Sequence, residues 1–543
     1  MDNSHRSDRR CRARLLLGVA ALAVVAPLSI PGVAAADTPA APSPSPSASA
    51  GGTAPQWTTR TVAPGVEVRT GTLKNPAATP SWTITVQAEV KARYTGAQAW
   101  AAVGTEAWAS QTADRLRAAG LDPVVAGVPW PDYADTPHGL MGVRVRVGSF
   151  PTQDAARSVA SQVTAAGLRN VVEWTGYDVD QAADVENISV AVIDPRRFRG
   201  AVEATHGDNV ADRETTSAVA ARLGSLVGVN GGFFVTSAAD GVPGIMAGIG
   251  AYDGELTSMA VGSRAALILG DGGRRTRIAD LSTTVTARAG RAEHAVEGIN
   301  RTPGRLRNCG RPGAVPTADP RHDTTCTTAD ELVKFTDDYA TALPTGDGVQ
   351  VVLDAKDRVV SVGDRTGTVA PGQTVLQGIG GAAGWLTEHA KPGRKLSVTE
   401  DIRDEHGRKV TLHARDSIVS AGPTLVEDGR TRIDAATEGV LDPQDLSFGF
   451  AWANSRQPRT MAGIDRRGRL LLVTVDGRLS GGSEGFTLAE GAAFMRSLGA
   501  VDALNLDGGG SSAMAVNGAL VNRPSDATGE RPVGDTIQVL PTR

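Results

Sequence analysis

The sequence has 543 residues, of which 41% are hydrophobic and 21% are charged. A chain of this length is too long for one hydrophobic core, so two or more domains are expected. Its formal net charge of -4 gives no reason to expect a nucleic-acid partner, because binding a polyphosphate usually requires a basic surface.

The N-terminal segment has the three parts of a secretory signal peptide. Several arginines precede an apolar run from Leu15 to Ile30, and three consecutive alanines follow a few residues later. We therefore expect residues 1–36 to be cleaved before Asp37, and the protein to be secreted, extracellular or associated with the cell wall. A retained membrane anchor is the alternative, but an apolar run of about 16 residues is short for a bilayer span.

Residues 37–56 are dominated by Pro, Ser, Ala and Thr. This composition buries too little apolar surface to fold, so it predicts a linker. A short strand-like stretch, Trp57–Thr72, comes next. Together these segments lead to the first regular pattern of helices and strands.

Residues 57–178 are predicted to form a small ferredoxin-like domain with the order βαββαβ. The expected strands are Trp82–Val90, a stretch around Val124, Val143–Phe150 and Val171–Trp174, and the expected helices are Ala107–Ala119 and Asp154–Ala166. With the string Val147-Gly148-Ser149-Phe150, this order resembles a SPOR domain. The resemblance implies a peptidoglycan or cell-wall glycan partner, and a generic small α/β module is the alternative.

Residues 186–543 are predicted to form a larger domain, and the whole chain is assigned to the α+β class with a β-rich C-terminal part. Short β-branched strands dominate, at Ile188–Ile193, Val349–Leu353, Arg358–Val362, Val410–Leu412, Arg469–Val475 and Thr536–Leu540. Two helices, Thr215–Leu223 and Thr487–Leu498, each precede a strand that ends in a candidate site loop. Residues 271–329 are polar and are predicted to be an insertion.

Cleavage of the signal peptide leaves two cysteines, Cys309 and Cys326, in a chain bound for an oxidising compartment. We expect them to form one disulfide that closes a local loop. A zinc site that includes His322 is the alternative, but two cysteines and one histidine are too few ligands for a structural zinc site.

The most informative stretch is Asn505-Leu506-Asp507-Gly508-Gly509-Gly510-Ser511-Ser512. An apolar approach, a carboxylate, three glycines and two hydroxyls predict a strand that enters a ligand-binding loop suited to a phosphate or a sugar. The alternative is a tight turn that happens to be rich in glycine. The loop is not a Walker loop, because no Gly-Lys-Ser/Thr follows it.

Four further motifs occur with this loop in one order along the chain: Val229-Asn230-Gly231-Gly232-Phe233-Phe234, Arg459-Thr460, Val475-Asp476-Gly477-Arg478 and Arg531-Pro532-Val533-Gly534-Asp535. As a set, these motifs resemble the phosphodiester glycosidase family, over about residues 186–543. The family's best known member removes N-acetylglucosamine from a phosphodiester-linked mannose tag. The resemblance implies that the Asn230, Arg459, Asp476–Arg478 and Asp507–Ser512 positions line one pocket.

Hydrolysis of a sugar-1-phosphate diester on its glycosidic side requires groups that hold the phosphate and, commonly, two carboxylates that act as acid and base. The catalytic candidates are Asp507, Asp476 and Asp535. The candidates for binding substrate or phosphate are Asn230, Gly231, Arg459, Thr460, Gly477, Arg478, Gly508, Gly509, Gly510, Ser511, Ser512 and Arg531. Arginine suits this role because its guanidinium matches phosphate in a bidentate way.

Several alternatives stay open at this point. Asp476-Gly477 is also a common hairpin turn, and a salt bridge between Arg531 and Asp535 would explain both residues without catalysis. No cofactor is expected, but a divalent cation on carboxylate and loop oxygens is left undecided. The main alternative to an enzyme is a non-catalytic cell-wall carbohydrate-binding protein, and a glycosidase with no phosphate requirement is another.

Overall fold

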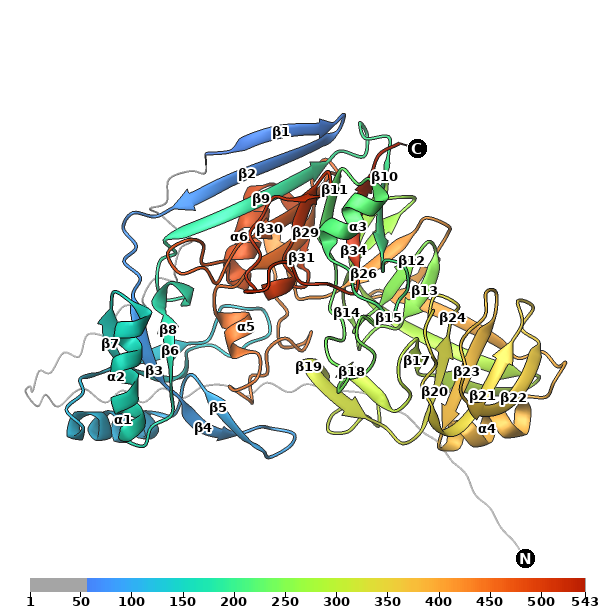
Figure 1. Ribbon diagram of the computed structural model, residues 1–543, viewed down its shortest axis with the longest axis horizontal. Helices are drawn as coiled ribbons and strands as arrows, with labels where there is room; N and C mark the ends of the chain where they lie inside the picture. The colour runs from blue at the N-terminus through green and yellow to red at the C-terminus, as the bar shows by residue number, and fades with distance from the viewer. Residues whose placement is uncertain (1–55, 543) are drawn as a thin grey trace, which may run out of the picture. The chain divides into compact units, whose positions relative to one another are not determined.

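The computed structural model describes residues 56–542 (Figure 1). The predicted signal peptide, residues 1–36, and the predicted linker up to residue 55 lie outside the described residues. Between residues 56 and 542, no helix has both the length and the apolar character needed to cross a membrane. Strands far outnumber helices, which confirms the prediction of a β-rich α+β fold.

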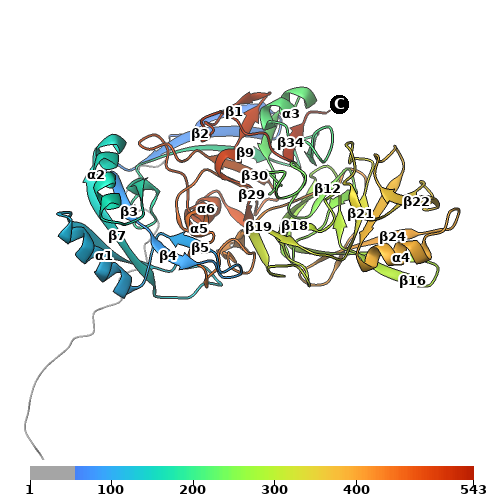
Figure 2. The same cartoon turned by 60° about the horizontal axis from the view of Figure 1, so that its bottom comes forward.

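The predicted βαββαβ unit is present. Its strands are β3 (Trp82–Val86), β6 (Pro123–Pro129), β7 (Leu140–Phe150) and β8 (Asn170–Trp174), which form an antiparallel sheet in the order β6-β7-β3-β8. Helices α1 (Glu106–Ala118) and α2 (Gln153–Ala165) lie on one face of this sheet (Figure 2). A hairpin that the sequence did not predict, β4 (Ala88–Lys91) and β5 (Gln98–Ala101), precedes α1.

Local sequence explains these two helices. Thr105 and Thr152 each cap a helix by accepting a hydrogen bond from the backbone N–H three residues later. Alternate residues of the central strand β3, Ile84 and Val86, are fully buried against the helices. The opposite sheet face carries Thr85, which is also fully buried, so the helices are not the only cover of this sheet.

A second hairpin joins the larger domain although it precedes the βαββαβ unit in sequence. Strands β1 (Thr58–Ala63) and β2 (Val66–Lys74) extend an antiparallel sheet through β9 (Val185–Ile193), and we call this the first sheet. The segment 57–178 therefore contributes to two sheets. The domain boundaries at 57, 178 and 186 remain predictions.

Among the described residues, the larger domain contains four sheets of five or eight strands, besides a two-stranded hairpin described below. The first has the order β1-β2-β9-β30-β29-β31-β27-β28, where β30 is Leu470–Val475, β29 Arg459–Asp465, β31 Ala500–Asn505, β27 Thr424–Glu427 and β28 Arg430–Thr431. The second has the order β10-β34-β11-β32-β33, where β10 is Ala201–Thr205, β34 Thr536–Leu540, β11 Val227–Asn230, β32 Met514–Val516 and β33 Ala519–Leu520.

The third sheet has the order β13-β12-β26-β14-β15-β24-β25, with β16 (Ala292–Val296) paired to β15. Its strands are β13 Glu255–Ser258, β12 Gly250–Tyr252, β26 Ser417–Ser420, β14 Arg264–Gly270, β15 Arg275–Ala289, β24 Ser397–Asp404 and β25 Lys409–Val410. The fourth has the order β17-β20-β23-β21-β22, with strands Gly298–Ile299, Glu331–Phe335, Thr374–Ile379, Gly346–Leu353 and Val359–Arg365.

Alternation along β14 shows how these sheets pack. Leu267 and Leu269 are buried in a core shared with the first and second sheets, whereas Ile268 faces a core shared with the fourth sheet. The third sheet is therefore buried on both faces. Its long strand β15 lies within the predicted insertion at residues 271–329 and pairs with β14 and β24.

The remaining helices are α3 (Thr216–Leu223), α4 (Gly381–His389), α5 (Phe450–Asn454) and α6 (Leu488–Ser497), with short 3-10 turns at Thr175–Tyr177 and Gly509–Ser511. The predicted helix before β31 is α6, which begins with a capping box between Thr487 and Glu490. It covers the first sheet in a core with Met461 and Ala503. This packing fixes β31, whose C-terminal end leads into the glycine-rich loop.

Candidate active site

The glycine-rich loop is fastened at both ends to one buried asparagine. Asn230, the last residue of β11, is fully buried, and its Nδ2 donates to the Asp507 carbonyl at 2.8 Å. Its Oδ1 accepts from the Ala513 N–H at 3.1 Å and from the Thr460 hydroxyl at 2.6 Å. Asn230 and Thr460 therefore support the loop between the first and second sheets.

The glycines make room for two arginines. A Cβ at Gly509 would lie 3.2 Å from Nη1 of Arg478, and a Cβ at Gly510 would collide with Nη2 of Arg531. The N–H of Gly508 donates to the Asp507 carboxylate at 2.9 Å, and the N–H of Gly509 donates to the Pro458 carbonyl at 2.9 Å. The loop thus brings guanidinium groups close to Asp507.

Arg478 follows β30 and has a left-handed backbone, with φ of 57°. Its Nη2 donates to the Gln457 side-chain oxygen, and within residues 56–542 it forms no ion pair. Burial lowers its pKa, and the neighbouring positive charge of Arg531 lowers it further. Arg531 is held by two hydrogen bonds to Asp526, at 2.8 and 3.0 Å. An anion in this place would therefore meet one guanidinium that lacks a carboxylate partner.

Asp507 is largely buried, and burial raises the pKa of its carboxyl group to about 7. The Ser511 hydroxyl, the Gly508 N–H and Arg531 each lower this pKa, whereas Asp323 raises it. A carboxyl group that is half protonated near neutral pH is suited to donate or accept a proton during catalysis.

The other two candidate aspartates hold loops in place. Asp535 is 2% exposed and accepts from the Gly232 N–H at 2.8 Å and the Tyr252 hydroxyl at 3.0 Å. Asp476 accepts from the Arg523 N–H at 3.0 Å. Burial raises the pKa of each carboxyl group to about 6. Neither side chain lines the cavity that contains Asp507.

Close packing explains why two further candidate positions, 231 and 477, are glycines. A Cβ at Gly231 would collide with the Asp535 carboxylate, and a Cβ at Gly477 would lie 2.5 Å from the Pro458 nitrogen. Arg459 is buried as well. Its Nε donates to the Phe486 carbonyl at 2.9 Å, so it supports the site from behind without lining it.

Asp507 opens onto a cavity of about 230 Å³. Its lining combines aromatic and apolar side chains with the glycine loop and its neighbouring arginines. The lining residues are Phe233, Phe234, Thr236, Ala247, Arg307, Asn308, His322, Asp323, Trp452, Arg478, Asp507, Gly508, Gly509, Gly510 and Arg531. A cavity with an apolar wall and a few convergent polar groups is typical of a small-ligand site.

Four of these lining residues come from a hairpin that the sequence did not assign to the site. Strands β18 (Arg305–Cys309) and β19 (Pro320–Thr327) pair with each other, and the structure joins Cys309 to Cys326 by a disulfide with a Cα–Cα distance of 5.3 Å. We call residues 305–327 the disulfide hairpin. It contributes Arg307, Asn308, His322 and Asp323 to the cavity.

His322 belongs to the aromatic part of the lining. Its ring centroid lies 4.2 Å from that of Phe233 and 5.3 Å from that of Trp452. Burial lowers its pKa to about 4, so the imidazole is neutral at pH 7. In the sequence, His322-Asp323 lies between the two cysteines, and this position suggested only a zinc site that includes His322. The described residues contain no group of three or more His, Cys, Asp or Glu side chains placed to hold a metal ion.

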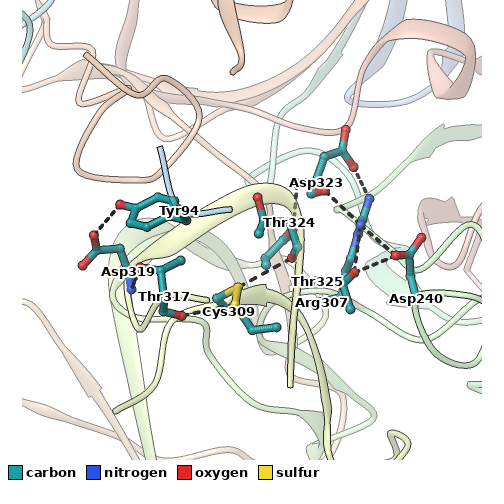
Figure 3. Close-up of a disulfide and its surroundings, with 11 residues drawn as sticks. Tyr94, Asp240, Arg307, Cys309, Thr317, Asp319, Asp323, Thr324 and Thr325 are labelled. Atoms are coloured by element: carbon teal, nitrogen blue, oxygen red, sulfur yellow. Dashed lines mark hydrogen bonds and ion pairs between the residues drawn. A yellow bond between two sulfur atoms is a disulfide. The ribbon is translucent and has the colours of Figure 1, made fainter. Parts of the chain in front are cut away.

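Figure 3 shows the disulfide hairpin with contacts on both sides. On one side, Arg307 pairs with Asp323 at 2.5 Å and with Asp240 at 3.3 Å. On the other side, the Tyr94 hydroxyl, from the turn between β4 and β5, donates to Asp319 at 2.8 Å. The hairpin is therefore fixed both inside the larger domain and by the β4–β5 hairpin.

Comparison with known proteins identifies two domains in this chain. The family called phosphodiester glycosidase matches residues 347–540, and the SPOR domain family matches residues 100–172. The chain carries a phosphodiester glycosidase domain, preceded by a SPOR domain. The first match includes the Arg459, Asp476–Arg478 and Asp507–Ser512 motifs, but it excludes the disulfide hairpin.

The N-acetylglucosamine-1-phosphodiester alpha-N-acetylglucosaminidases of mouse and cattle are 36% and 43% identical to this chain over 103 residues. That segment is 19% of this chain and 20% and 19% of the two relatives, so the chain matches about a fifth of their length. A Burkholderia pseudomallei protein that is proposed to be exported has a crystal structure with a TM-score of 0.77 and 32% identity, covering 90% of this chain and 96% of that one. A hypothetical protein from Synechocystis shares the fold alone, with a TM-score of 0.51 and 17% identity.

Proposed function

We propose that this protein is a secreted phosphodiester glycosidase that hydrolyses a sugar-1-phosphate diester of cell-envelope glycopolymers or glycans. The observation that carries the proposal is the cavity, whose lining combines Asp507 with aromatic side chains and with the guanidinium groups of Arg307, Arg478 and Arg531. The names of the mouse and cattle relatives support N-acetylglucosamine as the sugar.

Two sets of side chains in the cavity each suit one part of such a substrate. The Arg478 guanidinium lacks a carboxylate partner among residues 56–542, and guanidinium groups bind phosphate through two parallel hydrogen bonds. The rings of Phe233 and Trp452 offer an apolar surface on which one face of a sugar ring can pack. A sugar phosphate bound by both sets of side chains would bring its glycosidic bond into the cavity that Asp507 lines.

Asp507 is proposed to protonate the departing phosphate oxygen. An ionised carboxylate beside a phosphate would repel it, whereas a protonated carboxyl group can donate a hydrogen bond to it. The raised pKa of Asp507, about 7, keeps much of this group protonated at neutral pH. Asn230 and Thr460 assist indirectly, because they fix the backbone on either side of the carboxyl group.

The SPOR domain supports a location at the cell wall. In this proposal the domain holds the enzyme near wall glycans, which raises the effective concentration of a wall-bound substrate. The Burkholderia relative supports export. Peptidoglycan is therefore the proposed partner of the SPOR domain, and the sugar phosphodiester is the proposed partner of the cavity.

The test measures free sugar released from UDP-N-acetylglucosamine and from a methyl diester of N-acetylglucosamine-1-phosphate. The parent protein is compared with Asp507→Asn, which preserves the shape of the side chain but cannot protonate the leaving group. General acid catalysis contributes about 10²- to 10⁴-fold, so kcat/KM should fall by at least 100-fold. Binding of both diesters without sugar release by the parent would favour the non-catalytic carbohydrate-binding protein.

A further inference from the structure

Two carboxylates, Asp507 and Asp323, line the cavity. The other aspartates of the glycosidase motifs are engaged elsewhere, since Asp535 accepts from Gly232 and Asp476 accepts from the Arg523 N–H. Hydrolysis of glycosidic bonds commonly uses a pair of carboxyl groups that flank the bond to be broken. Among the described residues, Asp323 is therefore the carboxylate that shares the cavity with Asp507, although it also pairs with Arg307.

The disulfide hairpin holds Asp323 in a defined position. Its backbone is left-handed, with φ of 59°, and its N–H donates to the Asn308 side chain at 2.9 Å. Nη1 of Arg307 donates to its carbonyl at 3.0 Å, while Nη2 of the same guanidinium contacts its carboxylate. The side chain is 69% exposed although the backbone around it is fixed. This arrangement presents a carboxylate to whatever enters the cavity.

We propose that Asp323 is the second catalytic carboxylate of this site and acts with Asp507 on the glycosidic bond of the sugar-1-phosphate diester. This inference rests on the proposed function and adds a residue that the family match at 347–540 does not include. It also explains why a disulfide hairpin lies beside the glycine loop.

In the proposed step, Asp323 removes a proton from a water molecule while the water oxygen attacks the anomeric carbon. The bond between the anomeric carbon and the phosphate oxygen breaks, and its electron pair leaves with that oxygen. Asp507 gives its proton to the same oxygen. The products are the free sugar and a phosphate monoester, and no oxidant, reductant or other co-reactant is needed.

The charges around the two carboxyl groups support this division of roles. The His322 imidazolium, which forms only in the acidic range where Asp323 also titrates, and the Arg307 guanidinium lower the pKa of Asp323. Asp323 is therefore ionised at neutral pH, whereas burial raises the pKa of Asp507 to about 7. Environments that separate the pKa values of two neighbouring carboxyl groups are typical of acid and base pairs. Asp323 also adds negative charge near Asp507, which helps to keep Asp507 protonated.

The alternative is that Asp323 only orients Arg307. The experiment therefore compares Asp323→Ala and Asp323→Asn with Asp319→Asn, a matched control on the same hairpin. Asp319 is 56% exposed and bonds to Tyr94 on the side of the hairpin away from the cavity. Each full-length protein is assayed with UDP-N-acetylglucosamine, with and without sodium azide, and its thermal unfolding is recorded.

The expected result is a fall in kcat of at least 100-fold for both Asp323 variants, with KM within about threefold of the parent. Azide is a small nucleophile that needs no deprotonation, so it should restore turnover of Asp323→Ala and give a sugar azide. Asp319→Asn should keep the activity of the parent. Asp323→Asn covers the case in which Asp323→Ala does not fold.

The inference is overturned if the Asp323 variants keep more than a tenth of the parent's kcat, if only KM rises, or if azide restores nothing to a folded variant. These results leave the proposed function intact, because the parent still releases sugar. A parent that releases no sugar from any diester overturns the proposed function, and the role of Asp323 with it. The two failures are thus distinguishable in one assay.

Discussion

Both regions for which a carbohydrate ligand is proposed contain arginines, but the partners of these arginines differ. In the cavity of the glycosidase domain, the Arg478 guanidinium donates to the neutral Gln457 side chain, and it forms no ion pair within residues 56–542, although Asp526 and Asp507 are close enough to raise its pKa. On the SPOR sheet, Arg144 pairs with Asp178 at 3.3 Å and with Asp180 at 2.7 Å. Of these two arginines, only Arg478 can bind an anion without first breaking an ion pair.

The carboxylates that pair with the arginines of the SPOR sheet belong to the segment that follows β8. Asp178 and Asp180 follow β8 and lie against the sheet face opposite α1 and α2, where Arg146 also pairs with Asp178, at 2.5 Å. Arg456 of the glycosidase domain donates to the Asp178 carbonyl at 2.7 Å and so holds this segment from the other side. A residue type therefore predicts a ligand only when the rest of the chain leaves its charge unpaired.

Among the changes that test this comparison between the two regions, removing the unpaired guanidinium should have the largest effect. For Arg478→Ala we expect kcat/KM on a sugar-1-phosphate diester to fall about 10- to 150-fold, because a hydrogen bond to a charged group contributes about 1.5–3 kcal/mol. The matched control is Arg144→Ala, which should leave sugar release unchanged. Equal losses on a phosphate-free aryl glycoside would contradict a phosphate-binding role for Arg478 and favour an ordinary glycosidase.

The pH dependence of catalysis tests the proposed role of Asp507 as the acid. Asp507 has a pKa of about 7 and is proposed to act in its protonated form, so kcat/KM should fall tenfold for each pH unit above that value. The charged groups that face it are Arg531, Arg478 and Asp323, and His322 stays neutral throughout this range because its pKa is about 4.

A substitution beside Asp507 sharpens this test. Arg531 lowers the pKa of Asp507, so Arg531→Gln should raise that pKa and move the alkaline limb to higher pH. A rate that does not change between pH 6 and 9, or a limb that stays in place in this variant, would show that Asp507 is not the group that must be protonated. Buffers of constant ionic strength are required, because salt screens these interactions.

Much of the fold was predictable because its signals are local. Strands β30 and β34 were predicted within a few residues, since each is a short apolar run between turn residues. β15 was not predicted. Only Ala279, Leu281, Val285 and Ala287 of its 15 residues are buried, and its many Thr and Arg side chains resemble a polar loop in composition.

The candidate site shows the same contrast between residues with a local sequence signal and residues that only tertiary packing brings together. Glycines and turn residues mark Asp507 and Arg478 in the sequence, and both of these predicted residues line the cavity. The sequence could not show that Asp476 and Asp535 are directed at backbone N–H groups, because side-chain direction depends on strands far away in the chain. Asp323 was missed for a related reason, since only tertiary packing brings the disulfide hairpin to the glycine loop.

The smallest expected effect concerns the SPOR sheet and tests the comparison directly. Asp178 and Asp180 form ion pairs with arginines that a glycan would otherwise contact. The double variant Asp178→Asn, Asp180→Asn should therefore bind isolated peptidoglycan glycan strands a few-fold more tightly than the parent. The increase should be larger at low salt. Sedimentation with glycan strands measures this change, and Asp154→Asn, on the outer surface of α2, is the control. The effect is expected to be modest because Asp180 is 44% exposed and surface ion pairs are weak. Unchanged binding by a folded double variant would mean that this face does not meet glycan even when its arginines are free, and that any attachment to the wall uses another surface.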